Sequence, residues 1–252
     1  MHHLLNAPSR VAAFGIMRLP SSASASSSSQ HHRILCGSAE LSTSSSNLPW
    51  LVVGLGNPGK LYQGTRHNVG FEMIEAFAEA EGIRMTTTQH KALMGRGEVG
   101  SSQVLVAKPQ TFVNLSGESV GPLATYYRIP IHQILVIYDD MDLEFARLRL
   151  LPKGGHGGHN GMRSVIQHLK GSKDFPRLKI GIGRPPGKME PASFVLRKFA
   201  KDEREEMDIM LARGIDVVRE VILKGAVKAC STCNEPKKGQ VKTSGKASVQ
   251  TS

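Results

Sequence analysis

The stretch that most constrains this chain runs from Leu51 to Gly59 and reads Leu-Val-Val-Gly-Leu-Gly-Asn-Pro-Gly. Its first six residues are apolar, β-branched or glycine, which predicts a short buried β-strand. The strand must stop at Asn57-Pro58-Gly59, because proline fixes φ and glycine permits backbone conformations that side chains forbid. The polar amide of Asn57 is therefore placed at the end of a buried strand, where it can meet a ligand.

Ten residues later, His67 stands in Thr65-Arg-His-Asn-Val-Gly70. Imidazole is the side chain whose unperturbed pKa lies near neutrality. A helix is expected to begin around Asn68, so one strand and one loop bring an amide and an imidazole to the same end of the sheet. The alternative for His67 is a histidine that only caps this helix.

The following chain alternates between strand and helix patterns. Strands are predicted as a hairpin over 94–108 and at 133–138, 147–150 and 177–183, and helices at 69–81, 118–127, 162–169 and 201–224. This alternation predicts a single-domain α/β fold, in which a mixed, mostly parallel sheet is flanked by helices. From Ala226 onward the chain is polar and lysine-rich, which predicts a frayed end.

The two ends of the chain differ from its middle. Residues 1–47 are rich in serine and contain three arginines and one acidic residue. This composition is typical of an organellar transit peptide, and the abundance of serine favours a chloroplast over a mitochondrion. The alternative is a disordered linker. The folded domain is then expected to cover 48–228, followed by a disordered, lysine-rich tail over 229–252.

Charge and composition limit the class of partner. The formal net charge of +11 favours a polyanionic partner such as nucleic acid. No apolar run approaches the roughly 18 residues that a membrane helix needs, so no membrane association is predicted. The chain has three cysteines, which form no disulfide framework and fit a reducing compartment. Cys230 and Cys233 are interpreted as incidental.

Several predicted strands and loops end in polar groups. These groups are Asn57, His67, Asn114, Asp139, Asp140, Asp142, His156, His159 and Asn160. In open α/β sheets, ligands bind beyond the carboxyl ends of the strands, so we expect these groups to converge. A histidine beside a carboxylate can act as a general base. No serine or cysteine stands in a nucleophile motif, so water is the expected nucleophile and hydrolysis the expected reaction.

Two metal sites are alternatives for parts of this set. The acidic cluster at Asp139, Asp140 and Asp142 could hold Mg²⁺, but no phosphate-binding motif accompanies it, and the last two are interpreted as turn residues. His156 and His159 could be metal ligands, but they lack a third ligand at a recognisable spacing. A hydrogen-bonding loop is therefore preferred, and neither a metal nor a cofactor is predicted.

Six motifs in register carry a resemblance to a known family. They are Gly-Leu-Gly-Asn-Pro-Gly (54–59), Thr-Arg-His-Asn-Val-Gly (65–70), Lys-Pro-Gln-Thr-Phe-Val-Asn-Leu-Ser-Gly (108–117), Tyr-Asp-Asp-Met-Asp-Leu (138–143), Gly-Gly-His-Gly-Gly-His-Asn-Gly (154–161) and Arg-Leu-Lys-Ile-Gly-Ile-Gly-Arg-Pro (177–185). In order and spacing they resemble the bacterial-type peptidyl-tRNA hydrolases over roughly residues 50–225.

This resemblance implies an enzyme that cleaves the ester between a peptide and the 3′ ribose of tRNA. It implies that His67 is the general base that activates water, that Asp139 orients and polarises it, and that Asn57 positions the substrate. The substrate-binding residues that it implies are Tyr62, Val113, Asn114 and Asn160. Two positions depart from the family, since Val113 usually is methionine and Tyr138 is histidine in many bacterial members.

The partners expected from the resemblance are peptidyl-tRNA and its phosphate backbone, bound by a monomer. Recognition should depend on the phosphate backbone and the shape of the tRNA, because a hydrolase of all peptidyl-tRNAs cannot depend on one nucleotide sequence. The basic residues nearest to the expected site in sequence are Arg147, Arg149, Lys153 and Arg163.

The sequence is also similar to the plant chloroplast group II intron splicing factors, which descend from the same hydrolases and recruit RNA-binding partners. The glycine loop has the enzyme-like form, and no apolar docking patch is obvious in the sequence, so the enzyme is preferred. An exposed apolar patch on the folded surface would favour the splicing role.

Overall fold

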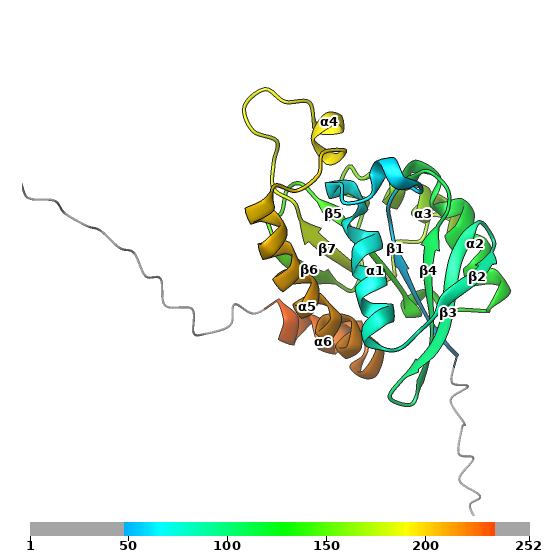
Figure 1. Cartoon of the computed structure of the whole chain (residues 1–252). Helices are drawn as coiled ribbons and strands as arrows, with labels where there is room; N and C mark the ends of the chain where they lie inside the picture. Colours follow the sequence, from blue (N-terminus) through cyan, green and yellow to red (C-terminus); the bar gives the residue numbers. More distant parts are fainter. Residues whose placement is uncertain (1–47, 235–252) are drawn as a thin grey trace, which may run out of the picture. The chain divides into compact units, whose positions relative to one another are not determined.

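The computed structural model describes residues 48–234, which form a seven-stranded sheet covered by helices on both faces (Figure 1). The strand order is β2-β3-β4-β1-β5-β7-β6. The strands are β1 (Trp50–Gly54), β2 (Met85–Gln89), β3 (Ala92–Val99), β4 (Ser102–Pro109), β5 (Ile134–Asp140), β6 (Leu148–Leu151) and β7 (Arg177–Gly181).

The sheet is mixed, as predicted, and its parallel part lies in the centre. Strands β4, β1, β5 and β7 pair in parallel, whereas β2–β3, β3–β4 and β6–β7 are antiparallel. Sequence patterns missed β2, because Met85–Gln89 is an edge strand whose three central residues are exposed threonines. Such a segment has no apolar alternation to identify it.

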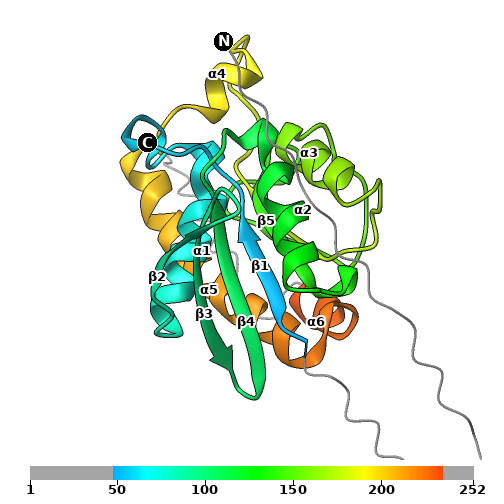
Figure 2. The same cartoon turned by 90° about the vertical axis from the view of Figure 1, so that its right-hand side faces the viewer.

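Six α-helices of the described part surround the sheet. They are α1 (Val69–Ala80), α2 (Gly117–Tyr126), α3 (Asn160–His168), α4 (Pro191–Val195), α5 (Lys201–Lys224) and α6 (Ala226–Cys233). Side chains of α1, α5 and α6 form one core on one face of the sheet, and those of α2 and α3 form a second core on the other face (Figure 2). Helix α5 has the bounds that the sequence predicted.

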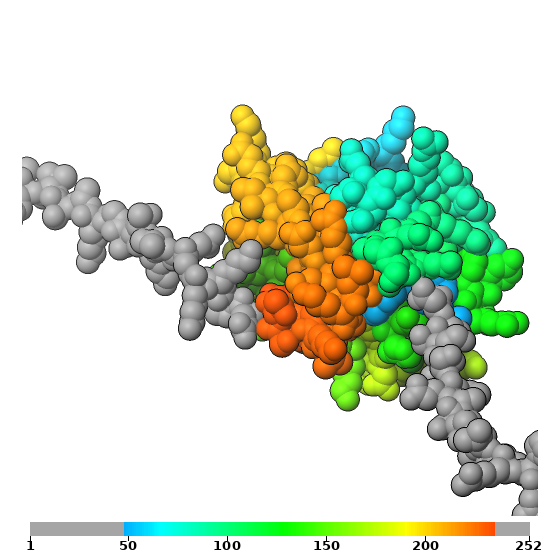
Figure 3. Space-filling view, turned by 90° about the horizontal axis from the view of Figure 1, so that it is seen from below, coloured from blue at the N-terminus to red at the C-terminus, as the bar shows by residue number. Residues whose placement is uncertain are grey.

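The prediction of a frayed end from Ala226 is wrong for the first eight residues, which form α6. Figure 3 shows α6 beside the end of α5. The side chain of Asn234 receives a hydrogen bond from the Leu150 N–H and donates one to the Leu150 carbonyl, at 3.0 and 2.7 Å. The predicted boundary at residue 229 therefore falls inside a helix. The predicted transit peptide and residues 235–252 of the predicted tail lie outside the described residues.

Two glycines allow α1 to begin directly against the end of β1. A Cβ at Gly54 would overlap with the carbonyl of Gly70, and a Cβ at Gly70 would lie 2.5 Å from the carbonyl oxygen of Leu55. This close approach places the turn before α1 next to the loop after β1. In residues 48–234, no helix combines the length and the apolar character that crossing a bilayer requires.

Candidate active site

His67 and Asp139 form a hydrogen-bonded pair at the carboxyl ends of the strands. His67 lies in the 3-10 turn η2 (Arg66–Asn68), and Asp139 lies near the end of β5. Nδ1 of His67 and Oδ1 of Asp139 are 2.7 Å apart, and the aspartate side chain is 3% exposed. Because a carboxylate only accepts hydrogen bonds, Nδ1 carries the proton. The lone pair of Nε2 is then left available as a base.

Opposing effects set the pKa values of this pair. Burial disfavours the charged form of Asp139, but His67 and His159 stabilise it and hold the pKa of the carboxyl well below its usual range. Burial also acts to lower the pKa of His67, but the charge of Asp139 and its hydrogen bond outweigh this effect and raise that pKa above its ordinary value. Asp139 is therefore ionised at neutral pH and strengthens His67 as a base.

A second imidazole binds the same carboxylate oxygen. His159 precedes α3, and its Nδ1 accepts the Met162 N–H at 3.2 Å. The proton is therefore on Nε2, which donates to Oδ1 of Asp139 at 3.1 Å. The ligand atoms of His67, Asp139 and His159 lie close enough together to consider a metal ion, but their direct hydrogen bonds already satisfy both N–H donors. The preferred interpretation of His159 as a hydrogen-bonding residue agrees with this geometry.

Asn57 is oriented by its neighbours in the loop after β1. Its side-chain oxygen accepts the Val113 N–H at 2.8 Å. Because Oδ1 is bound in this way, the NH₂ group is the end that Asn57 can offer to a substrate oxygen. The side chain of Asn68 bonds to the Asn57 main chain at both its N–H and its carbonyl, each at 2.9 Å. The sequence alone predicts no role for Asn68.

Three other predicted substrate residues, Tyr62, Asn114 and Asn160, lie on three separate elements. Tyr62 is half-buried, with its ring edge against Phe112. Asn114 and Asn160 are exposed, and Oδ1 of Asn160 accepts a hydrogen bond from Arg163 at 2.6 Å. Among the described hydrogen bonds, neither asparagine reaches His67 or Asp139. The structure thus joins His67, Asp139 and His159 by hydrogen bonds, whereas Asn114 and Asn160 are exposed and are not bonded to these three residues.

A buried arginine holds the glycine-rich loop that carries His159. The Arg177 guanidinium donates to the carbonyls of Gly154 and Gly155, and also to those of Lys173 and Phe175 at 3.0 Å each. The sequence pattern predicts Arg177 only as part of a strand. A charged residue at the start of an apolar strand was the signal that could have identified this role.

The neighbouring aspartates have structural partners. Oδ1 of Asp140 accepts the Asp142 N–H at 2.8 Å, which is the turn geometry expected for these residues. Its other oxygen pairs with Lys179 at 2.6 Å. Asp142 forms an ion pair with Arg184.

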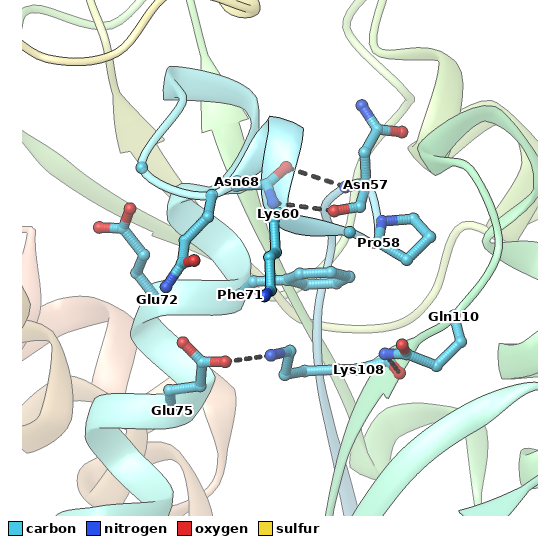
Figure 4. Close-up of a pocket in the computed structure, with 12 residues that line it drawn as sticks. Asn57, Pro58, Lys60, Asn68, Phe71, Glu72, Glu75, Lys108 and Gln110 are labelled. Atoms are coloured by element: carbon cyan, nitrogen blue, oxygen red, sulfur yellow. Dashed lines mark hydrogen bonds and ion pairs between the residues drawn. The ribbon is translucent and has the colours of Figure 1, made fainter.

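A polar pocket of about 310 Å³ lies beside the site, between the loop after β1, the start of α1 and the end of β4. Figure 4 shows that the Asn57 side chain points away from Phe71, whereas the Asn68 side chain is linked to the Asn57 main chain. Lys108 crosses the pocket wall to pair with Glu75. The pocket therefore adjoins the back of the Asn57 loop and does not contain the His67–Asp139 pair.

Comparison with known proteins identifies the family. Residues 51–242 match the family model for peptidyl-tRNA hydrolase. The chain is 63% identical over 186 residues to a mitochondrial peptidyl-tRNA hydrolase of Oryza sativa subsp. japonica, covering 74% of each chain. It is 62% identical over 190 residues to a chloroplastic peptidyl-tRNA hydrolase of Arabidopsis thaliana, covering 75% of this chain and 66% of that protein.

Two further relatives bear on fold and function. A chloroplastic group IIB intron splicing facilitator of Zea mays is 57% identical over 177 residues, covering 70% of this chain and 69% of that protein. The crystal structure of peptidyl-tRNA hydrolase from Acinetobacter baumannii is 37% identical and matches with a TM-score of 0.69, covering 75% of this chain and 95% of that chain. The chain therefore belongs to the peptidyl-tRNA hydrolase family.

Proposed function

We propose that this protein hydrolyses peptidyl-tRNA, cleaving the ester between the peptide and the 3′ ribose and so returning free tRNA. The observation that carries the proposal is the hydrogen bond between His67 and Asp139, which leaves Nε2 of His67 as the free nitrogen. Membership of the peptidyl-tRNA hydrolase family supports the choice of substrate.

In the proposed reaction, Nε2 of His67 removes a proton from a water molecule while the water oxygen attacks the ester carbonyl carbon. Asp139 stabilises the imidazolium that forms, and His159 holds the carboxylate in place through a second hydrogen bond to Oδ1. The NH₂ group of Asn57 donates to the carbonyl oxygen as negative charge develops there. The ribose oxygen then leaves with the proton from His67, giving a peptide carboxylic acid and the tRNA hydroxyl.

We propose that exposed basic residues of the protein contact phosphates of the tRNA backbone. Arg149, Lys153 and Arg163 are exposed, and Arg147 is exposed and paired with Glu144 at 3.3 Å. Arg163 lies in the first turn of α3, the helix that follows His159 in the chain. We propose a monomer, because one chain supplies every group of the proposed mechanism.

The proposed compartment is the chloroplast, with the mitochondrion as the alternative. Relatives with each of these organelles in their names exist at 62–63% identity. Residues 1–47 fused to a fluorescent protein test the choice. Fluorescence that coincides with chlorophyll supports the chloroplast, and fluorescence that coincides with a mitochondrial dye overturns it.

The activity is tested with the purified protein and N-acetyl-phenylalanyl-tRNA in water enriched in ¹⁸O. We expect release of N-acetyl-phenylalanine with one ¹⁸O atom in its carboxyl group, because water attacks the carbonyl carbon. A folded protein that releases no N-acetyl-phenylalanine would overturn the proposal.

The second candidate function is that of a splicing facilitator, and the 57% identity to the Zea mays protein favours it. Large apolar side chains are exposed on several elements: Leu61, Phe112, Leu115, Tyr126, Leu196, Ile209, Leu223 and Val227. These side chains belong to several elements, which cover both faces of the sheet. Binding of group II intron RNA or of a protein partner by a chain that fails to hydrolyse the ester would support this second function.

A further inference from the structure

The residue before His67 is a buried arginine whose terminal nitrogens, Nη1 and Nη2, both have partners on a distant segment, whereas its buried Nε has no hydrogen-bond partner. Nη2 of Arg66 lies 2.6 Å from both carboxylate oxygens of Glu203, and Nη1 lies 2.6 Å from the carbonyl oxygen of Lys198. The guanidinium carbon lies 4.5 Å from the ring centre of Phe194 and 5.0 Å from that of Phe199. The Arg66 side chain is only 8% exposed.

The main chain joins the same two segments. The Arg66 N–H donates to the carbonyl of Arg197 at 3.0 Å, and Thr65 forms an antiparallel bridge with Lys198. Residues 183–200, here called the crossing segment, include α4 and lead from β7 to α5 above the carboxyl ends of the strands (Figure 1). Arg66 is therefore the side chain through which the turn of His67 is held against the crossing segment.

Glu203 connects this contact to α5. One of its oxygens also accepts the Ala200 N–H at 2.7 Å, which caps the first turn of α5. Helix α5 in turn packs closely on α1, since a Cβ at Gly214 would overlap with Met73. The Arg66–Glu203 pair thus ties the turn of His67 to a helix whose position is fixed by the core.

His67 is restrained on both sides along the chain. Asn68 is bonded twice to Asn57 in the loop after β1, and Arg66 is bonded to Glu203 and the crossing segment. The three residues form one 3-10 turn, so the backbone at His67 cannot shift without breaking one of these contacts. Its imidazole faces Asp139 at 2.7 Å and the ring of His159 at 5.0 Å between centroids.

We infer that Arg66 is a positioning residue for His67, and that its Nη2, which contacts both carboxylate oxygens of Glu203, together with its Nη1 on the Lys198 carbonyl keeps Nδ1 of His67 within hydrogen-bonding reach of Asp139. The kinetic consequence rests on the proposed function, whereas the geometric one does not. A lysine at this position would keep the positive charge but cannot bond both carboxylate oxygens and the Lys198 carbonyl in one plane.

The test compares the wild-type protein with Arg66→Lys. The control is Arg219→Lys, because Arg219 pairs with Glu81 and joins α5 to the far end of α1 in the same chemical manner. For each protein, kcat and KM are measured with N-acetyl-phenylalanyl-tRNA, and the pKa of His67 is measured by NMR. Glu203→Gln is the second variant, which removes the charge of the partner but leaves Arg66 and its carbonyl contact in place.

For Arg66→Lys we expect kcat to fall about 10- to 100-fold with KM within about twofold, since small misplacements of a base affect the transition state most. The pKa of His67 should move down toward its ordinary value as the hydrogen bond with Asp139 loosens. Glu203→Gln should change both quantities in the same direction by less, and Arg219→Lys should change neither.

Unchanged kcat and an unchanged pKa of His67 in folded Arg66→Lys would overturn the inference, as would an equal loss in Arg219→Lys. If the wild type itself releases no N-acetyl-phenylalanine, the proposed function fails. The pKa comparison still decides whether Arg66 positions His67 in that case.

Discussion

The carboxamide of Asn68 makes two hydrogen bonds to the main chain of Asn57, and both are 2.9 Å long. One residue of the His67 turn is thereby joined to Asn57, which lies in the loop after β1, eleven positions earlier in the chain. Both residues are buried. The amide and the imidazole of the candidate site therefore share one rigid frame.

Asn68→Ala should lower both stability and activity. It removes both bonds and leaves a buried N–H and a buried carbonyl of Asn57 without partners, at a cost of about 1–3 kcal/mol in the free energy of unfolding. Urea unfolding measures this loss. Asn68→Asp keeps an acceptor for the Asn57 N–H but loses the donor. If both variants unfold like the wild type, the frame is not held by these bonds.

As pH is lowered, kcat/KM should fall along an acid limb whose midpoint lies above pH 6.5. The neutral form of His67 is the base, its ordinary pKa is 6.5, and the site raises that pKa. Activity is therefore lost as pH falls through the raised pKa. Asp139→Asn removes the charge that raises it, so the limb should move to lower pH while the plateau falls at least about tenfold. A limb that stays in place in Asp139→Asn would contradict this account.

Gly70→Ala should destabilise the fold where α1 packs on β1. The added Cβ would lie 2.5 Å from the Leu55 carbonyl oxygen, and overpacking of this kind costs about 1–3 kcal/mol. Gly155→Ala is the control, because nothing lies within 4 Å of a Cβ there. Thermal unfolding of the two variants measures the difference. Equal melting temperatures would show that α1 can move away from β1 without cost.

The proposed contacts of Arg149, Lys153 and Arg163 with tRNA phosphates should make tRNA binding depend steeply on salt. Replacing Arg149, Lys153 or Arg163 by alanine should weaken binding of tRNAs of different sequence alike. Each replacement should also reduce the slope of log K against log salt by roughly one for every phosphate that the variant no longer neutralises. Titrations at several salt concentrations measure the slope. An unchanged slope in all three variants would place the RNA elsewhere.

The local part of this structure could be predicted from the sequence. The apolar run at Leu51 identifies β1, the helical spacing after Asn68 identifies α1, and the sequence pattern predicts the bounds of α5 as the structure has them. The exposed threonines of β2 and the short α6 escaped prediction, because neither has enough residues in a period to reveal a buried face.

The site could be predicted only for residues that follow directly from the order of the predicted strands and loops. The convergence of His67 and Asp139 follows from the rule that ligands bind at the carboxyl ends of strands. The bonds of Arg66 to Glu203 and of Arg177 to the glycine loop depend on how distant segments pack. No local pattern encodes such packing. The exposure of Asn114 and Asn160 likewise depends on how distant segments pack around them.

His67 is the residue on which the proposed reaction depends most. Its most direct test is the initial rate of N-acetyl-phenylalanine release from tRNA by the wild type, by His67→Ala and by His132→Ala, whose histidine is exposed in the 3-10 turn η4 (Ile131–Gln133) before β5. We predict that His67→Ala, still folded, loses at least about 10²-fold in rate, while His132→Ala keeps the wild-type rate. Equal rates for all three proteins would contradict the proposed mechanism, because the ester would then be cleaved without the His67–Asp139 pair.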